Sequence, residues 1–114
     1  TLLSNDIFQK QLEKVELLFK VKNEFKRGFK IELDFLDDAF QVVQHIDPME
    51  IPELAPDFEQ RVSIVINDSP LFLKATKLKV NVQLKSSSDG SIINPNVQKS
   101  LSFKSAGDFY LKIE

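Results

Sequence analysis

The single histidine, His45, is the residue best suited to acid–base chemistry in this sequence of 114 residues. Histidine changes charge near neutral pH, and a carboxylate such as that of Asp47 would complete an acid–base pair. A hydrolase built on His45 would need a carboxylate within hydrogen-bond reach of the ring, and a triad would also need a nucleophile. The simpler interpretation is a histidine at a strand end, on the polar face beside Ile46. With no cysteine and no second histidine, zinc binding is not expected.

Carboxylates gather in two parts of the chain. One group, at a predicted strand end and turn, comprises Asp34, Asp37 and Asp38; the other, in the stretch 47–59, comprises Asp47, Glu50, Glu53, Asp57 and Glu59. Oxygen-rich loops can hold calcium, which takes about 6–8 oxygen ligands, but neither spacing matches a defined calcium loop. We expect a solvated acidic loop that keeps a sheet edge from pairing, and calcium binding by the loop 47–59 stays open.

Five basic residues surround the first predicted loop, with Glu24 among them: Lys20, Lys22, Lys26, Arg27 and Lys30. They could contact phosphate or an acidic partner, but lysines at a hairpin tip also discourage edge-to-edge aggregation. The net charge of −2 gives no general attraction to nucleic acid or to an anionic membrane. We therefore expect no nucleic-acid partner.

No motif in the sequence indicates an enzyme. Glycine-rich phosphate loops and G-x-S-x-G turns are absent, and a glycosidase cleft would need sugar-stacking aromatics, whereas the chain has no tryptophan and one tyrosine. Asn67-Asp68-Ser69 matches an N-glycosylation triplet, a pattern that is common by chance. We therefore predict no catalytic, cofactor-binding or metal-binding residues.

Alternation of apolar and polar residues with a period of two predicts strands at 15–21, 29–35, 78–84 and 109–113. We expect these stretches to supply the buried core, and the first two to form an antiparallel hairpin. Weaker strands at 40–46, 62–66 and 101–103 bring the total to about seven. The sequence thus predicts an all-β, two-sheet antiparallel immunoglobulin-like sandwich, as a single domain over residues 1–114.

The connections between these strands carry turn and helix signals. Asp68-Ser69-Pro70 predicts a short connector helix, and residues 1–12 a helical or extended lead-in, with Asn5 or Asp6 as a cap. Pro48, Pro52 and Pro56 favour a crossover loop over 47–59. Further turns or loops are predicted at 86–90, 94–96 and 105–108.

A few apolar residues fall outside the buried pattern. Leu18 and Leu36 lie on otherwise polar faces, and Ile92-Ile93 lies in a turn region. Together they would form a patch for a partner protein or a neighbouring domain.

The order of these features resembles two kinds of domain. A strand ending in Phe19-Lys20-Val21-Lys22-Asn23 precedes a short loop, and a later strand closes on Asp37-Asp38 before the Ile51-Pro52 connector. This pattern, over residues 13–114, is similar to the water-stress and hypersensitive-response domain of late-embryogenesis-abundant proteins. The last strand, over 105–111, resembles that of β-sandwich portions of uncharacterised bacterial envelope lipoproteins. Neither family is catalytic, so the resemblance implies a module without site residues.

Two functions remain open from the sequence. The first is a non-enzymatic structural or protein-interaction module of a bacterial envelope or secreted protein. The second is a ligand-binding module for a glycan or an apolar small molecule. No apolar run approaches the roughly 18 residues of a membrane span. Because the chain begins at Thr1, we interpret it as a trimmed or mature fragment, which a leader or lipid anchor could precede.

Overall fold

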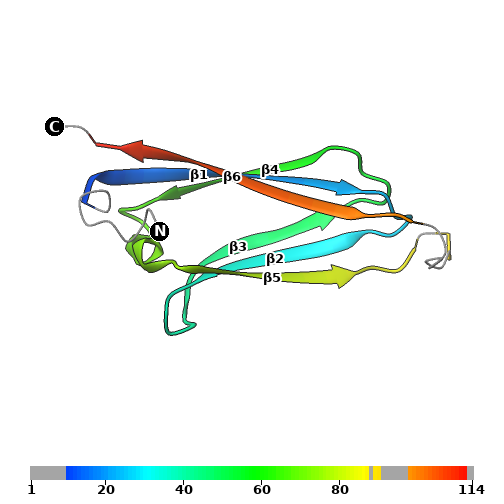
Figure 1. Cartoon of the computed structure of the whole chain (residues 1–114), viewed down its shortest axis with the longest axis horizontal. Helices are drawn as coiled ribbons and strands as arrows, with labels where there is room; N and C mark the ends of the chain where they lie inside the picture. Colours follow the sequence, from blue (N-terminus) through cyan, green and yellow to red (C-terminus); the bar gives the residue numbers. More distant parts are fainter. Residues whose placement is uncertain (1–9, 88, 91–97, 113–114) are drawn as a thin grey trace.

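The computed structural model describes residues 10–87, 89–90 and 98–112, and almost all regular structure in this part of the chain is β-strand. Six strands form two antiparallel three-stranded sheets, drawn one above the other in Figure 1, with the orders β4-β1-β6 and β3-β2-β5. The strands are β1 (Leu12–Asn23), β2 (Phe29–Leu36), β3 (Val42–Ile51), β4 (Phe58–Val65), β5 (Lys77–Leu84) and β6 (Leu101–Leu111). This arrangement confirms the predicted all-β, two-sheet antiparallel sandwich.

The first two strands belong to different sheets, so the predicted hairpin between them is wrong. β1 pairs with β4 and β6, whereas β2 pairs with β3 and β5. At Gly28, in the connecting loop, a Cβ atom would lie 3.1 Å from the carbonyl oxygen of Ile51, so any other residue would require the two backbone segments to move slightly apart. The crossing places the two apolar faces opposite each other, which a flat hairpin could not do.

The strand predicted at 40–46 is longer and later than expected. β3 includes Asp47 and Pro48, because a register shift between the pairs of Ile31 and Leu33 accommodates an extra residue there. A bulge on an edge strand is one of the few places in a sheet where proline is tolerated. The crossover loop is therefore shorter than the predicted range 47–59 and covers 52–57 only.

The strands predicted at 101–103 and 109–113 form one strand, β6, so the turn predicted at 105–108 is wrong. Ser105, Ala106 and Gly107 pair directly with Phe19, Leu18 and Leu17 of β1, and the small side chains interrupt the apolar alternation without interrupting the ladder. The turn predicted at 86–90 is present, with the Gly90 N–H donating to the Ser87 carbonyl oxygen at 3.4 Å, but it does not join a hairpin of β5 and β6, which belong to different sheets. The loop predicted at 94–96 lies outside the described residues.

The predicted connector helix is present as the 3₁₀ helix η2 (Pro70–Lys74), which leads from β4 in one sheet to β5 in the other. Pro70 stands at the first helical position as expected, but the capping residue Ser69 makes no side-chain hydrogen bond. Most of the predicted lead-in lies outside the described residues; Lys10 and Gln11 are helical, and Leu12 already belongs to β1. Among the described residues, no helix combines the length and apolar character that crossing a bilayer requires.

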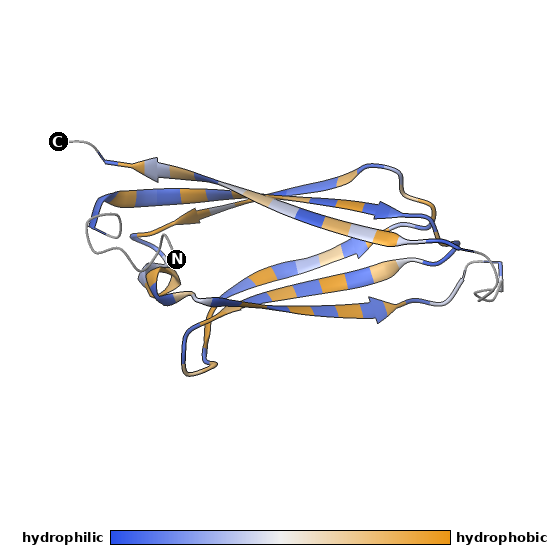
Figure 2. Ribbon diagram, viewed as in Figure 1, coloured by the Kyte–Doolittle hydropathy of each residue, from blue (hydrophilic) through white to orange (hydrophobic). Residues whose placement is uncertain are grey.

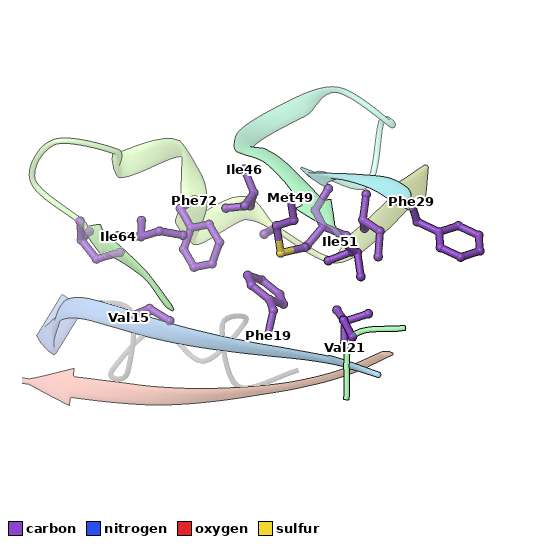
Figure 3. Packing of buried hydrophobic residues seen from close by; sticks show 14 of the residues in the cluster. Val15, Phe19, Val21, Phe29, Ile46, Met49, Ile51, Ile64 and Phe72 are labelled. Atoms are coloured by element: carbon purple, nitrogen blue, oxygen red, sulfur yellow. The ribbon is translucent and has the colours of Figure 1, made fainter. Parts of the chain in front are cut away.

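Apolar and polar residues alternate along the strands, as the hydropathy colours in Figure 2 show. The inner apolar side chains of β1 and β2 meet in one core, which confirms the buried faces predicted at 15–21 and 29–35 (Figure 3). Phe19, Ile31 and Leu33 are each about 1% exposed. The radius of gyration is 17.1 Å, against about 13 Å for a compact domain of this length. The sandwich is thus elongated along its strands.

Candidate functional site: the open side of the sandwich

The inner-face residues of β5 are the largest departure from a closed core. They alternate along the strand and lie beside the buried inner row of β2, with Ile31 opposite Val82 and Leu33 opposite Val80. Ile31 and Leu33 are 1% exposed, whereas Val80 and Val82 are 44% and 46% exposed. The whole β5 row, at 39–49% exposure, is Leu78, Val80, Val82 and Leu84. The sequence correctly predicts which residues of 78–84 point to the inner face, but the prediction that they are buried is wrong.

The C-terminal half of β6 shows the same departure. Phe109 lies opposite the buried Val15 but is 39% exposed, and Leu111 is 41% exposed. At the other end of the strand, Phe103 stacks on Phe19 with ring centroids 5.9 Å apart. Figure 1 shows β6 diverging from β5 toward its C-terminal end. We call the exposed inner-face residues the open side: Leu78, Val80, Val82, Leu84, Phe109 and Leu111.

The opposite side of the sandwich, formed by β3 and β4, is closed. Its inner-face residues are 2–3% exposed: Ile46, Met49, Ile51 and Ile64. The same two sheets thus bury one pair of edge strands and leave the other pair uncovered. Scattered single apolar residues on a surface need no explanation, but a whole row of large side chains at 39–49% exposure does. Contiguous exposed apolar rows often mark contact sites.

The backbone of the open side is also unpartnered in the described part of the chain. β5 pairs only with β2, and β6 pairs only with β1, so each strand has one free edge. The β5 ladder runs without a register shift from Leu84 to Lys77. It has neither a proline nor a bulge, and of the features that commonly blunt exposed edges it carries only the charges of Lys77 and Lys79 on its outer face. β5 therefore offers a regular template for another strand.

Leu36 does not contribute to the apolar patch predicted from the sequence, because it is only 9% exposed. Leu18 is half-buried on the outer face of β1, and Ile92-Ile93 lies outside the described residues. In the sequence, the open side is visible only as the alternating pattern of 78–84. That pattern shows that one face of the strand is apolar, but not whether a second layer covers that face.

His45 pairs with Asp34 rather than with Asp47. The two residues are cross-strand partners on β3 and β2, and His45 Nδ1 donates a hydrogen bond of 2.5 Å to Asp34 Oδ1. The His45 side chain is 49% exposed. Ser63 lines the same hollow, yet among the described residues its hydroxyl makes no hydrogen bond to His45. The pair has acid–base character, but no nucleophile is hydrogen-bonded to it.

We expect the pKa of His45 to lie above its ordinary value of 6.5, chiefly because its hydrogen bond to Asp34 favours the charged ring. Since the folded-state pKa is raised, the stabilisation is fully present below the unfolded-state pKa and disappears as pH rises through the folded-state pKa. An NMR titration of the ring protons should show the Asp34→Asn variant titrating at lower pH than the parent chain. Asp47→Asn is the control and should change the midpoint less, because Asp47 acts only through space. Equal shifts in both variants would contradict the assignment.

Asp37 and Asp38, the other members of the first acidic group, have structural partners. Asp37 Oδ1 accepts hydrogen bonds of 2.9 Å from the backbone N–H groups of Ala39 and Gln41 and so holds the turn between β2 and β3. Asp38 accepts a hydrogen bond of 2.8 Å from the Thr76 hydroxyl. That bond, together with the nearby Lys77 ammonium, lowers the pKa of the Asp38 carboxyl. These carboxylates stabilise turns.

The acidic stretch 47–59 is divided between β3, a loop and β4. Glu50 forms an ion pair with Lys85, and Glu59 forms one of 3.6 Å with Lys20. Within 10–87, 89–90 and 98–112, no three acidic or histidine side chains converge as metal ligands. The residues do not form a common oxygen cage for calcium.

The predicted basic cluster is also distributed rather than gathered at a hairpin tip. Lys20 extends from β1, whereas Lys30 lies on β2 in the other sheet and pairs with Glu32 at 3.2 Å. Arg27 donates a hydrogen bond to the carbonyl oxygen of Lys85. Lys20 and Lys30 thus lie in different sheets, and the five residues do not share one hairpin tip.

Asn67, the acceptor position of the glycosylation triplet, is exposed in the turn after β4.

The comparisons with known proteins add no family to this geometry. The chain matches no protein-family model, and neither a curated protein nor a solved structure with significant similarity was found.

Proposed function

We propose that this chain is a non-enzymatic protein-contact module and that the open side is its contact surface. The exposure of the β5 inner row carries the proposal. Four large apolar side chains that share a face with the core remain 39–49% exposed, while the opposite side of the sandwich is closed. Covering such a row with another protein removes apolar surface from water at about 25 cal/mol per Å².

The polar groups support a contact role over catalysis. His45 and Asp34 form a half-exposed surface pair, and the remaining acidic groups discussed above stabilise turns or pair with lysines. A catalytic site requires a nucleophile or water positioned against an acid–base pair. The pattern shared with envelope lipoproteins extends the proposal to a bacterial envelope or secreted protein.

A site-specific photo-crosslinker tests the contact surface. Benzoylphenylalanine is placed at Val82 on the open side, or at Val65, a residue of similar exposure on β4. Each variant is produced in the cells that normally make the chain and then irradiated. We expect a discrete protein adduct at position 82 and none at position 65.

Equal adducts at the two positions, or none at either, would contradict the proposed contact surface. Circular dichroism and thermal melting confirm beforehand that both variants retain the fold of the parent chain. Mass spectrometry of the adduct then identifies the crosslinked residue on each side.

A further inference from the structure

We propose that the partner segment is an extended strand in which apolar and acidic residues alternate, and that it adds to the free edge of β5. This inference rests on the proposed function and specifies its ligand. Strand addition supplies main-chain hydrogen bonds from the edge, while alternate side chains supply specificity. The three features that support it are the β5 backbone, its inner row and its outer row.

The backbone of β5 provides the length and regularity that such an addition needs. Its eight residues pair with β2 in unbroken register, from Phe29 opposite Leu84 to Leu36 opposite Lys77. At about 3.3 Å per residue this edge is about 26 Å long. β3, by contrast, carries a bulge at Pro48, and its inner row is already covered. β5 thus combines a regular edge with an uncovered apolar row.

The inner row of β5 determines where the apolar residues of the partner lie. An added strand continues the sheet, so every second side chain points toward the same face as Val80 and Val82. On that face the added side chains cover the β5 row and lie on the side where Phe109 and Leu111 of β6 are exposed. The period of the partner is therefore two.

The outer row of β5 determines the charge of the partner residues that lie between its apolar ones. This row contains Lys77, Lys79, Asn81 and Gln83, and Lys85 follows the strand. Lys77 and Lys85 pair with Asp38 and Glu50; Lys79 lies opposite Asp34 of β2, but among the described residues it forms no ion pair. Opposite charges on neighbouring strands stabilise a sheet by roughly 0.2–1 kcal/mol per pair. A basic edge in a chain of net charge −2 favours an acidic strand.

The same row favours an acidic strand over a second copy of this chain as the occupant. In a symmetric antiparallel pairing of two β5 edges with full overlap, Lys79 would face Asn81 and Lys77 would face Gln83, so neither lysine would gain a carboxylate partner. A strand with glutamate or aspartate at alternate positions supplies one opposite Lys79.

Synthetic peptides of about ten residues test the inference. The probe alternates glutamate with valine; one control has the same composition with the valines grouped at one end, and the other alternates lysine with valine. Fluorescence anisotropy at low salt should give the alternating acidic peptide at least tenfold tighter binding than either control. Hydrogen exchange should show the added protection at the backbone amides of β5.

Surface variants keep the test independent of folding. Lys79→Glu should weaken binding of the acidic peptide severalfold and strengthen binding of the lysine–valine peptide, since only the edge charge is reversed. Val82→Glu should weaken binding of the acidic peptide at least tenfold, whereas Val65→Glu on β4 should change its binding by less than twofold. Circular dichroism and melting of each variant verify the fold.

Several results would overturn the inference. The first is equal binding of the three peptides. The second is hydrogen-exchange protection, on peptide binding, of a strand edge other than β5. The third is unchanged peptide binding in Lys79→Glu. Protection of β5 in the free monomer would assign the edge to the chain's own termini, and protection that appears only on dimerisation would assign it to a second copy. A crosslink at Val82 without preference for the acidic peptide would leave the contact surface standing and reject only this ligand.

Discussion

Replacing Asn23 with alanine should lower the free energy of unfolding by about 3 kcal/mol, because three backbone groups lose their partner at once. Asn23 is 2% exposed at the end of β1. Its Nδ2 donates hydrogen bonds to the carbonyl oxygens of Arg27 (2.6 Å) and Pro52 (2.9 Å), and its Oδ1 accepts one from the N–H of Phe25 (2.9 Å). A buried group left without a partner costs about 1–3 kcal/mol.

The expected loss reflects the position of Asn23 between two loops. One loop joins β1 to β2, and the other joins β3 to β4, so the amide links both crossings between the sheets at this end. Urea unfolding followed by circular dichroism measures the effect. Asn81→Ala, at an exposed site on β5, is the control and should change stability by less than about 0.5 kcal/mol. A loss below about 1 kcal/mol at Asn23 would show that water replaces the amide.

The architecture could be predicted because the central strands have strong local patterns. Val15 to Val21, apart from Leu18, and Phe29 to Phe35 alternate so regularly that one face of each strand is apolar and the other polar. Two such faces bury each other most simply in a two-layer sandwich. Pro70 after Ser69 likewise predicted the connector helix from backbone preferences alone.

Pairing between strands could not be predicted in the same way. A short loop containing Gly28 is compatible with a hairpin, but also with a crossing to the other sheet, and only the packing of the two apolar faces selects the second. The contact between His45 and Asp34 depends on the same register, so the neighbour in sequence, Asp47, was the wrong expected partner. The hydrogen bond from the Asn23 amide to the Pro52 carbonyl oxygen also arises only once two distant loops meet.

The open side was missed for a related reason. Alternation reports which face a side chain occupies and does not report whether another layer covers that face. Val82 and Ile31 have the same phase and are direct neighbours across the ladder, yet one is exposed and the other buried. β3 and β5 are both edge strands of this sheet, yet β3 contacts β4 and η2 and its inner row is buried, whereas the inner row of β5 is exposed. Which edge strand is covered depends on how the two sheets pack, and local periodicity does not contain that information.

Alanine substitutions along this boundary should separate core from open side, by about 1 kcal/mol or more for two matched valines and by about 2 kcal/mol or more for Ile31. Ile31→Ala should lower the free energy of unfolding by about 3–4 kcal/mol and Val15→Ala by about 2 kcal/mol. Each residue is only 1% exposed, so each substitution leaves a cavity in the core. Val82→Ala makes the same chemical change as Val15→Ala at a side chain 46% exposed, and should cost less than about 1 kcal/mol. Urea unfolding of the three variants measures these differences. If Val82→Ala destabilised the chain as much as Val15→Ala, the β5 row would be part of the core, and both the contact surface and the added strand would lose their basis.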